Sequence, residues 1–210
     1  MKLLVTAFGP FGGRSRNASS LALAGLKRRL PWLNMRILPV DSVIAPLRLN
    51  QALRDLEPDA VILLGEAGNS STIRLEAIAW NELDFRIPDI AGRQPQGERI
   101  VECAPDFLRS SLPFETIHQE LSSARHPVSM SEDAGRYLCN QILFHTLHAL
   151  TRIPNPVPAG FIHLPLETVY PTPLAIDALE RTIDVVRREN NLVPPAGRKA
   201  ARCGIPVRSW

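Results

Sequence analysis

Runs of consecutive apolar residues alternate along this chain with segments of helical periodicity. Residues 60–64 read Ala-Val-Ile-Leu-Leu, and similar runs stand at 2–6, 35–40 and 159–163. A strand that is apolar at every position needs cover on both faces, as strands in a parallel sheet do. The pattern therefore predicts an α/β fold in which helices pack on both sides of a mainly parallel sheet.

Periodicity and capping signals place four helices between and after these strands. We expect them after Asn17 as far as Pro31, from the cap Asp41 to about Pro58, over about 131–150, and from the cap Thr172 onward. Ser129 and Glu132 have the spacing of a capping box for the third helix. Residues 71–81 look extended, and a connection rich in Pro, Gly and charge follows from 84 to about 98.

Length and charge indicate one domain followed by a basic tail. A chain of 210 residues with 45% hydrophobic content can bury one sizeable core, which we assign to residues 1–192. Residues 193–210 carry four basic side chains and no acid, and without those four the chain has 20 basic and 21 acidic residues. The excess positive charge therefore lies in a Pro/Gly-containing C-terminal tail, which is either solvated or binds a partner. Nucleic-acid binding is not expected.

The cysteines and the amino terminus point to a cytoplasmic protein with free thiols. Cys103, Cys139 and Cys203 show neither the CxxC spacing of a metal site nor the density of a disulfide scaffold. The apolar run at the amino terminus reaches Gly9 and Pro10 too early for a signal peptide or a membrane span. We therefore expect no attachment to a membrane.

Cys139 is a candidate nucleophile because it falls in the first turns of the third predicted helix. The helix dipole and the free backbone N–H groups at such a position favour an anion, and so favour a thiolate. The alternative is a small buried hydrophobe, the usual fate of a lone cysteine. Cys103 follows a charged loop and Cys203 sits in the tail, so both are weaker candidates.

A thiolate nucleophile needs a base, and five histidines compete for that role. His145 and His148 share the helix of the candidate nucleophile, but at about 100° per residue they point away from the thiol. His118 and His126 lie in polar connecting sequence and are expected at the surface. His163 ends a predicted strand, so it projects from the carboxyl edge of the sheet, where open α/β folds place their sites. A purely structural histidine is the alternative.

The third group of such a site is a carboxylate that fixes the tautomer of the imidazole. In an extended strand Glu76 would point to the same face as the apolar residues Ile78 and Trp80. A carboxylate on such a face is unusual unless it has a partner. The alternatives are a solvated edge position and a pairing with Arg74. Sequence spacing alone does not bring the three candidate groups together.

Two phenylalanines flank a tight turn near the amino terminus, in Phe8-Gly-Pro-Phe11-Gly-Gly. The loop lacks the Lys-Ser/Thr pair of a phosphate-binding loop and the spacing of a dinucleotide site. It suits a flat apolar slot for a small ring. The alternative is that both rings only fill the core.

Four separated motifs make the chain resemble the pyroglutamyl peptidase I (pyrrolidone-carboxylate peptidase) family of cysteine peptidases. They are residues 5–13 with Asn17, residues 64–68 continuing through Glu76 to 86–89, residues 131–140, and residues 160–165. They stand in the family's order, and the resemblance spans about residues 2–190. It implies a three-layer α/β/α single domain with a mainly parallel twisted sheet, and assembly as a homo-oligomer, either a tetramer or a dimer.

The resemblance also implies roles for single residues. Cys139 would be the nucleophile, His163 the base and Glu76 the group that orients the histidine, in a cysteine exopeptidase that cleaves after an N-terminal pyroglutamyl residue without a metal or cofactor. Peptides that begin with pyroglutamate are the expected partners. The residues that the resemblance places around the substrate are Phe8, Phe11, Asn17, Ile87, Tyr137 and Leu138, with Glu66 at a further pocket position and Arg86 beside the active site.

Departures from the family pattern lie on the substrate side. The residues that differ from the usual ones are Ala7, Gly9, Ala18, Glu66, Asn69, Ser70 and 166–168. They leave open a related thiol hydrolase that acts on another small cyclic amide or acyl substrate, and a non-catalytic α/β binding protein. Glu66 lies between Gly65 and Ala67 in a tight strand-end turn, so we expect its backbone rather than its side chain to face the ring.

Overall fold

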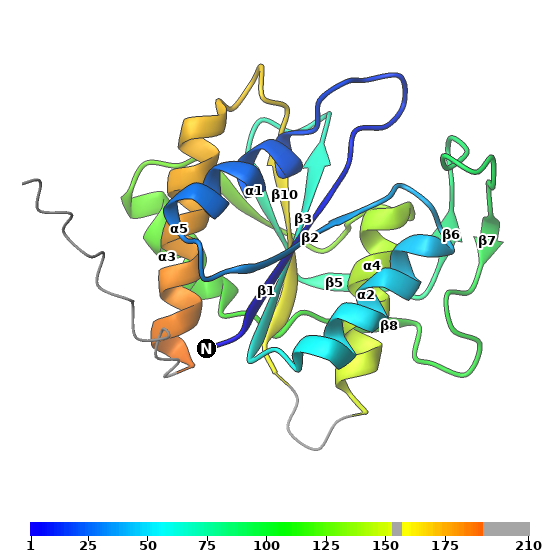
Figure 1. Ribbon diagram of the computed structural model, residues 1–210. Coiled ribbons are helices and arrows are strands. Elements are labelled where there is room, and N and C mark those ends of the chain that lie inside the picture. The colour runs from blue at the N-terminus through cyan, green and yellow to red at the C-terminus, as the bar shows by residue number, and fades with distance from the viewer. Residues whose placement is uncertain (153–156, 191–210) are drawn as a thin grey trace, which may run out of the picture.

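The computed structural model describes residues 1–152 and 157–190, and it consists of one central sheet with helices on two sides (Figure 1). The boundary expected at residue 192 and the tail 193–210 lie outside this part of the chain. The elements in order are β1 (Leu3–Phe8), α1 (Ala18–Arg29), β2 (Asn34–Leu38), α2 (Ile44–Leu56), β3 (Ala60–Ala67), β4 (Ile73–Glu76), β5 (Ile78–Trp80), β6 (Leu83–Asp84), β7 (Gln96–Glu98), β8 (Phe107–Arg109), α3 (Phe114–Ser123), β9 (Val128–Ser131), α4 (Leu138–Leu150), β10 (Ala159–Pro165) and α5 (Thr172–Glu189).

The central sheet has the strand order β2-β1-β3-β10-β4-β9. The strands from β2 to β10 are parallel to one another, while β4 pairs antiparallel with β10 and parallel with β9. The mainly parallel sheet expected from the sequence is therefore confirmed. Two short hairpin-like pairs, β5 with β8 and β6 with β7, lie outside it.

Alternating residues of β3 pack into two separate cores, one on each face of the sheet. Val61 and Leu63 belong to the core that includes α2 and α4, which we call the α4 face. Ile62 and Leu64 belong to the core that includes α1, α3 and α5, which we call the α1 face. Figure 1 shows these two groups of helices on opposite sides of the sheet, so the domain has the three layers expected.

The third predicted helix begins later than expected. α4 starts at Leu138, because residues 128–131 pair with β4 as a strand and Gly135 adopts a left-handed backbone conformation with φ of 80°. The capping box at Ser129 and Glu132 is therefore wrong. The apolar periodicity was correct for the helix body, but it carries no information about edge-strand pairing.

The other helix starts agree more closely with the sequence. Asn17 is the N-cap of α1, and the Asp41 carboxylate accepts two backbone N–H groups at the start of α2. In α5 the N-cap is Pro171, so Thr172 is the first helical residue rather than the cap. Within residues 1–152 and 157–190, none of the helices has the length and apolar character needed to cross a bilayer.

His126 is buried, and its expected surface position is wrong. Its Nε2 atom lies 2.9 Å from Oδ2 of Asp177, and its Nδ1 atom lies 2.6 Å from the hydroxyl of Tyr170. Both partners follow β10, far along the chain, and the sequence analysis also missed the helix α3 that precedes His126. The polar segment is therefore covered by a distant part of the same chain.

Candidate active site

Glu76 and His163 meet because β4 and β10 run antiparallel. In the register of this pair, His163 lies opposite Arg74 and Phe161 opposite Glu76, so Glu76 and His163 are diagonal neighbours on one face. The Nδ1 atom of His163 is 2.7 Å from Oε1 of Glu76. Glu76 is fully buried and His163 is 6% exposed, which keeps water away from this contact.

Cys139 approaches His163 from the start of α4. It is the second residue of the helix, whose N-cap Tyr137 supplies no side-chain cap. The backbone N–H groups of a first helical turn have no intrahelical partner, so they can stabilise negative charge at this point. Cys139 lies close enough to His163 to raise the pKa of the imidazole. The two candidates chosen from the sequence are therefore in contact.

Gly65 makes room for this approach. It pairs with His163 in the register of β3 and β10. A Cβ atom at this position would lie 2.6 Å from Cζ of Phe161 and 3.0 Å from Sγ of Cys139. A residue with a side chain would therefore push the thiol away from the sheet.

The charge state of His163 follows from its neighbours. Burial of the ring favours the neutral form, but the adjacent Cys139 and the Glu76 carboxylate favour the cation more strongly, so the pKa of His163 is raised to about 9. An imidazolium is thus stabilised beside the sulfur of Cys139. This arrangement allows the imidazole to take a proton from the thiol and later return it to a leaving group.

Arg74 is a second partner of Glu76. Its Nε atom is 3.2 Å from Oε1 of Glu76, while its Nη2 atom donates to Oγ of Ser131 at 2.6 Å and to the carbonyl oxygen of Asp133 at 2.7 Å. The two interpretations of Glu76 from the sequence, a partner of a histidine and a partner of Arg74, therefore both hold. The other oxygen, Oε2, makes no hydrogen bond within the described residues.

Asn140 holds the start of α4, a role that the sequence analysis missed. Its Oδ1 atom accepts the backbone N–H of Trp80 at 2.8 Å, and its Nδ2 atom donates to the carbonyl oxygens of Trp80 at 2.8 Å and Glu82 at 3.0 Å. All of these contacts are buried or partly buried. The available signal was an amide next to Cys139 in an otherwise apolar helix, since a buried amide must find several partners.

An aromatic cluster lies beside the thiol on the α4 face. The ring of Tyr137 stacks on Phe11 with 6.1 Å between ring centroids, and it packs against Phe85 at 4.4 Å. Phe8 and Leu138 are buried in the same core, and Cys139 packs against it. The structure therefore brings Phe8, Phe11, Tyr137 and Leu138 together near the thiol. Phe85 belongs with them but was not anticipated.

Three other residues expected near the substrate lie differently. Asn17 is buried and uses its Oδ1 atom to accept the backbone N–H and the hydroxyl of Ser19, at 3.0 and 2.6 Å. Arg86 and Ile87 are exposed, and Arg86 forms no ion pair in the part of the chain that the structure covers. The Tyr137 hydroxyl donates to the carbonyl oxygen of Pro88 at 3.2 Å, which holds this loop close to the aromatic cluster.

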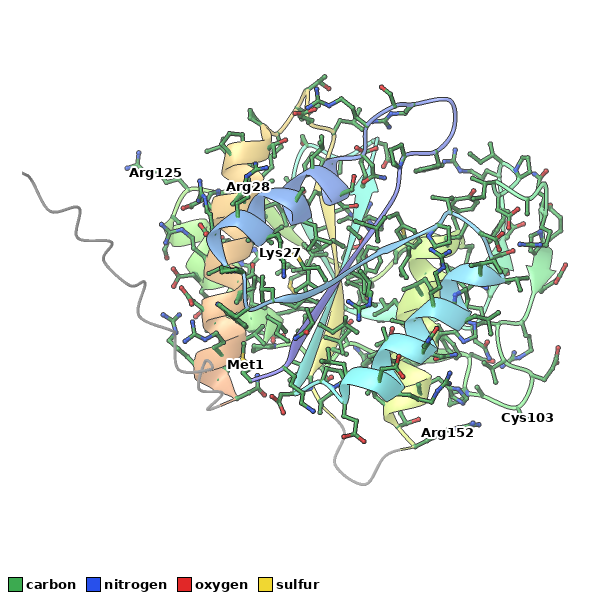
Figure 2. All side chains as sticks on the ribbon, in the orientation of Figure 1. Met1, Lys27, Arg28, Cys103, Arg125 and Arg152 are labelled. Carbon is green, nitrogen blue, oxygen red and sulfur yellow. The ribbon has the colours of Figure 1, made fainter. Side chains whose placement is uncertain are left out.

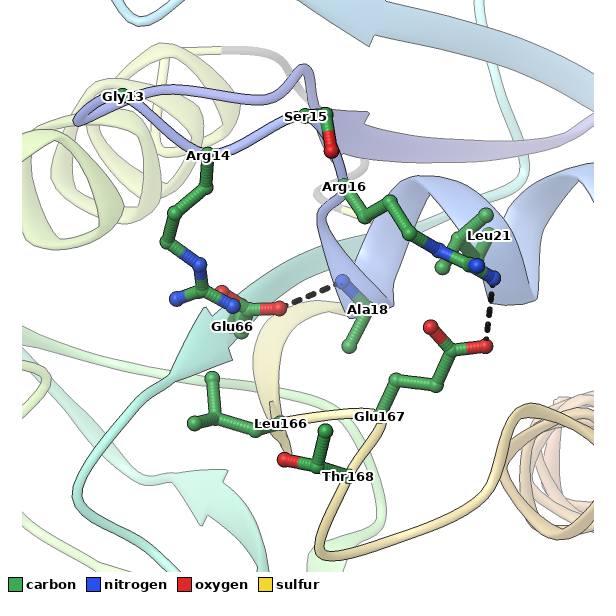
Figure 3. A pocket seen from close by; sticks show the side chains of 10 residues that line it. All are labelled: Gly13, Arg14, Ser15, Arg16, Ala18, Leu21, Glu66, Leu166, Glu167 and Thr168. Carbon is green, nitrogen blue, oxygen red and sulfur yellow. Dashed lines mark hydrogen bonds and ion pairs between the residues drawn. The ribbon is translucent and has the colours of Figure 1, made fainter.

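The side chain of Glu66 points to the α1 face, away from Cys139. Its Oε2 atom accepts the backbone N–H of Ala18 at 2.7 Å, and its Oε1 atom lies 2.7 Å from Nη1 of Arg14 (Figure 3). This follows from strand alternation, because the preceding Gly65 faces the thiol. Of the departures from the family pattern, Ala18, Glu66 and residues 166–168 line one cavity on this face.

Cys103 offers no comparable environment. It is exposed, and Figure 2 shows it at the outer rim of the molecule. Cys139 is partly buried against the aromatic cluster. Cys203 lies outside the described residues. Within the described ranges no group of three or more His, Cys, Asp or Glu side chains is placed to hold a metal ion.

A thiol next to a buried histidine–carboxylate pair, at the carboxyl edge of a three-layer α/β/α domain, is the arrangement of a cysteine-dependent hydrolase. Comparison with known proteins specifies the family. The family model described as pyroglutamyl peptidase matches residues 1–184, so the chain belongs to the pyroglutamyl peptidase family.

Relatives and solved structures agree with this assignment. The pyrrolidone-carboxylate peptidase of Thermococcus litoralis is 40% identical over 167 residues, which cover 78% of this chain and 76% of that protein. The protein of the same name from Yersinia pestis is 35% identical over 172 residues, or 78% of each chain. A crystal structure of pyrrolidone carboxyl peptidase from the hyperthermophile Pyrococcus furiosus superposes with a TM-score of 0.84 at 31% identity, covering 90% of this chain and 100% of that one.

Proposed function

We propose that this protein removes an N-terminal pyroglutamyl residue from peptides through an acyl-enzyme, with Cys139 as nucleophile, His163 as acid and base, and Glu76 as the group that orients His163. The observation that carries the proposal is the position of His163, next to Cys139 and 2.7 Å from the buried Glu76. Family membership supports the substrate class.

In the first half of the reaction, the sulfur of Cys139 attacks the carbonyl carbon that joins pyroglutamate to the next residue. The oxygen of the tetrahedral intermediate takes the negative charge, and the free N–H groups at the start of α4 are available to stabilise it. The C–N bond then breaks, His163 protonates the leaving amine, and a thioester remains. Oxyanion donors of this type contribute on the order of 3 kcal/mol each.

In the second half, His163 takes a proton from water and the resulting hydroxide attacks the thioester carbon. The C–S bond breaks, free pyroglutamate leaves, and the thiolate of Cys139 is regenerated beside the imidazolium. Glu76 keeps the Nδ1 proton of His163 in a hydrogen bond throughout, so Nε2 is the atom that exchanges protons. The chemistry needs only side chains and water.

The lactam ring is expected to bind at the aromatic cluster. Phe11 and Tyr137 offer flat apolar surfaces, and both pack against the core that contains Phe8 and Leu138. A neutral lactam has one N–H donor and one C=O acceptor, which backbone groups of the surrounding loops can match. We assign Ile87 to the rim of this site because the 86–88 loop is held to Tyr137.

Three further residues act around this site in the proposal. Asn17 shapes the loop that carries Phe11, since its amide caps α1 and its Nδ2 atom donates to Gly9 at 3.4 Å. Arg86 closes over bound substrate from the surface. Glu66 contributes through its backbone, because both of its carboxylate oxygens are engaged on the α1 face.

The decisive experiment is hydrolysis of pyroglutamyl-7-amido-4-methylcoumarin, compared with the prolyl and alanyl analogues. We expect cleavage of the pyroglutamyl compound alone, and its loss in Cys139→Ala and His163→Ala. Iodoacetamide should label Cys139 near neutral pH far faster than the exposed Cys103. Full turnover by Cys139→Ala would overturn the mechanism, and equal cleavage of all three compounds would overturn the substrate assignment.

The site of action and the assembly are part of the same proposal. A catalytic thiol has to stay reduced, which favours action in the cytoplasm, and fractionation of cells expressing the protein tests this.

Exposed apolar side chains gather around the β2–α2 connection, and they support a homo-oligomer that buries this surface: Ile37, Val43, Leu47 and Ile90. Light scattering of wild type and Leu47→Glu should show a dimer or tetramer that the substitution dissociates.

A further inference from the structure

A cavity of about 320 Å³ opens on the α1 face, and neither the proposed catalytic residues nor the rings of the aromatic cluster line it. It is lined by residues 13–16, Ala18, Leu21, Glu66 and 166–168 (Figure 3). We call it the arginine cavity, because Arg14 and Arg16 stand on its wall. No step of the mechanism above uses it.

Three chain segments connect this cavity to the catalytic side of the sheet. The amino-terminal loop places Phe11 in the aromatic cluster and then residues 13–16 on the cavity. β3 places Gly65 against the thiol and the next residue, Glu66, in the cavity wall. β10 carries His163, and the cavity residues 166–168 follow it directly. The aromatic cluster and the arginine cavity are therefore joined by short stretches of the same three segments that carry or contact the catalytic residues.

The carboxylates of the cavity are already engaged. The side chain of Glu66 is 3% exposed, and its two oxygens bind Arg14 and the N–H of Ala18, each at 2.7 Å. Oε1 of Glu167 accepts from Nη2 of Arg16 at 2.7 Å and from the hydroxyl of Thr172 at 3.0 Å. Both oxygens of Glu66 are thus used, whereas Glu167 uses only Oε1.

The guanidinium groups keep free donors. A guanidinium carries five N–H donors, and each of these two arginines directs one nitrogen to one carboxylate. The two ion pairs cancel in formal charge, but the side chains of Arg14 and Arg16 are 47% and 63% exposed, against 3% for Glu66 and 32% for Glu167, so an incoming group meets mainly guanidinium. The free N–H groups of Arg14 and Arg16 can bind a carboxylate, because a carboxylate can accept two parallel hydrogen bonds from one guanidinium.

We propose that the arginine cavity binds the peptide that follows pyroglutamate, and that Arg14 and Arg16 select an acidic side chain on it. This inference rests on the proposed pyroglutamyl peptidase activity. It adds a specificity on the leaving side of the scissile bond, so pyroglutamyl peptides with Glu or Asp near the cleavage point would be the better substrates.

The test compares two pairs of amidated peptides, pyroglutamyl-Glu-Ala with pyroglutamyl-Gln-Ala, and pyroglutamyl-Ala-Glu with pyroglutamyl-Ala-Gln. Glu and Gln have the same shape, so their kcat/KM ratio isolates the charge, and the amide removes the terminal carboxylate. In the wild type we expect a Glu/Gln ratio of about fivefold in at least one pair, which shrinks at high salt. Arg16→Gln and Arg14→Gln should each bring that ratio towards one.

Arg48→Gln is the matched control, because it removes the same charge from the exposed surface of α2. It should keep the wild-type ratio. Both kcat/KM values of a Glu/Gln ratio are measured on the same variant, so a partial loss of folded protein does not change the ratio. A ratio near one in both wild-type pairs, with pyroglutamyl-coumarin still cleaved, would overturn the inference alone. Absence of all pyroglutamyl cleavage would overturn the proposed function as well.

Discussion

The Nδ1 atom of His163 lies 2.7 Å from Oε1 of Glu76, in a contact that is closed to water on both sides. The hydrogen bond keeps a proton on Nδ1 and leaves Nε2 for the proton transfers of the proposed reaction. The two residues are 87 positions apart, and only the antiparallel pairing of β4 with β10 joins them. The first prediction follows from this contact.

Replacing Glu76 by Gln should lower kcat by about three to four orders of magnitude, since a Gln amide can donate to Nδ1 and favour the wrong tautomer. The measurement is kcat for pyroglutamyl-coumarin with circular dichroism as a check of folding. Glu82→Gln, at an exposed carboxylate, is the control and should keep its activity. Wild-type kcat in Glu76→Gln would show that the carboxylate does not orient the histidine.

The pH dependence follows from His163. Its pKa is raised to about 9, so the imidazolium is present below that value and is lost as the pH rises through it. We expect kcat/KM to fall on the alkaline side with an apparent pKa near 9. The stability that the charged ring contributes should be complete below about pH 6.5 and disappear through pH 9. An alkaline limb near pH 6.5 would contradict the ion pair.

Gly65→Ala should damage both stability and catalysis. The new methyl group would lie 2.6 Å from Phe161 and 3.0 Å from the sulfur of Cys139, and overpacking of this kind costs about 1–3 kcal/mol. Chemical denaturation and kcat measure the two effects. Gly68→Ala is the matched control, because the nearest atom there is 3.8 Å away on the flexible side chain of Leu166. Equal behaviour of the two variants would show that the close approach at Gly65 is unimportant.

Arg74→Gln should reduce kcat with little change in KM. Arg74 shares Oε1 of Glu76 with His163 and anchors it to Ser131, so its loss leaves a buried carboxylate with one partner fewer. We expect about a tenfold decrease in kcat and a stability loss of about 1–3 kcal/mol, since an under-satisfied buried acceptor carries that cost. Arg74→Lys should recover part of the activity. A change confined to KM would instead place Arg74 in substrate binding.

The two other histidines of α4 should not matter for turnover. Burial followed by the nearby His148 lowers the pKa of His145 to about 4, so His145 is neutral at working pH, and His148 stacks on Phe144 with 6.0 Å between ring centroids. His145→Gln and His148→Gln should therefore keep kcat within about twofold, because helix geometry points both side chains away from the thiol. If either proved as inactive as His163→Ala at unchanged stability, the assignment of the base would be wrong.

Much of the layout could be read from local pattern. The apolar runs at 60–64 and 159–163 identified a buried parallel sheet, because a strand that is apolar at every position needs cover on both faces. Helical periodicity placed Cys139 near a helix start. These are short-range properties of the chain. The parity argument for Glu76 assumed one strand with Ile78 and Trp80, but β4 ends at Glu76 and those two residues belong to β5 in another sheet.

What the sequence left undecided depended on contacts between distant segments. The pairing of β4 with β10 places Glu76 beside His163. Residues 128–131 pair with β4 as an edge strand, so α4 begins only at Leu138. His126 contacts Asp177, which lies 51 residues further along the chain. Neighbouring residues of a strand point to opposite faces of the sheet. Alternation could therefore have placed the Glu66 side chain only if the face towards which Gly65 points had been known. The free energy of each such contact depends on the packing of the whole sheet, so it cannot be derived from a short stretch of the sequence.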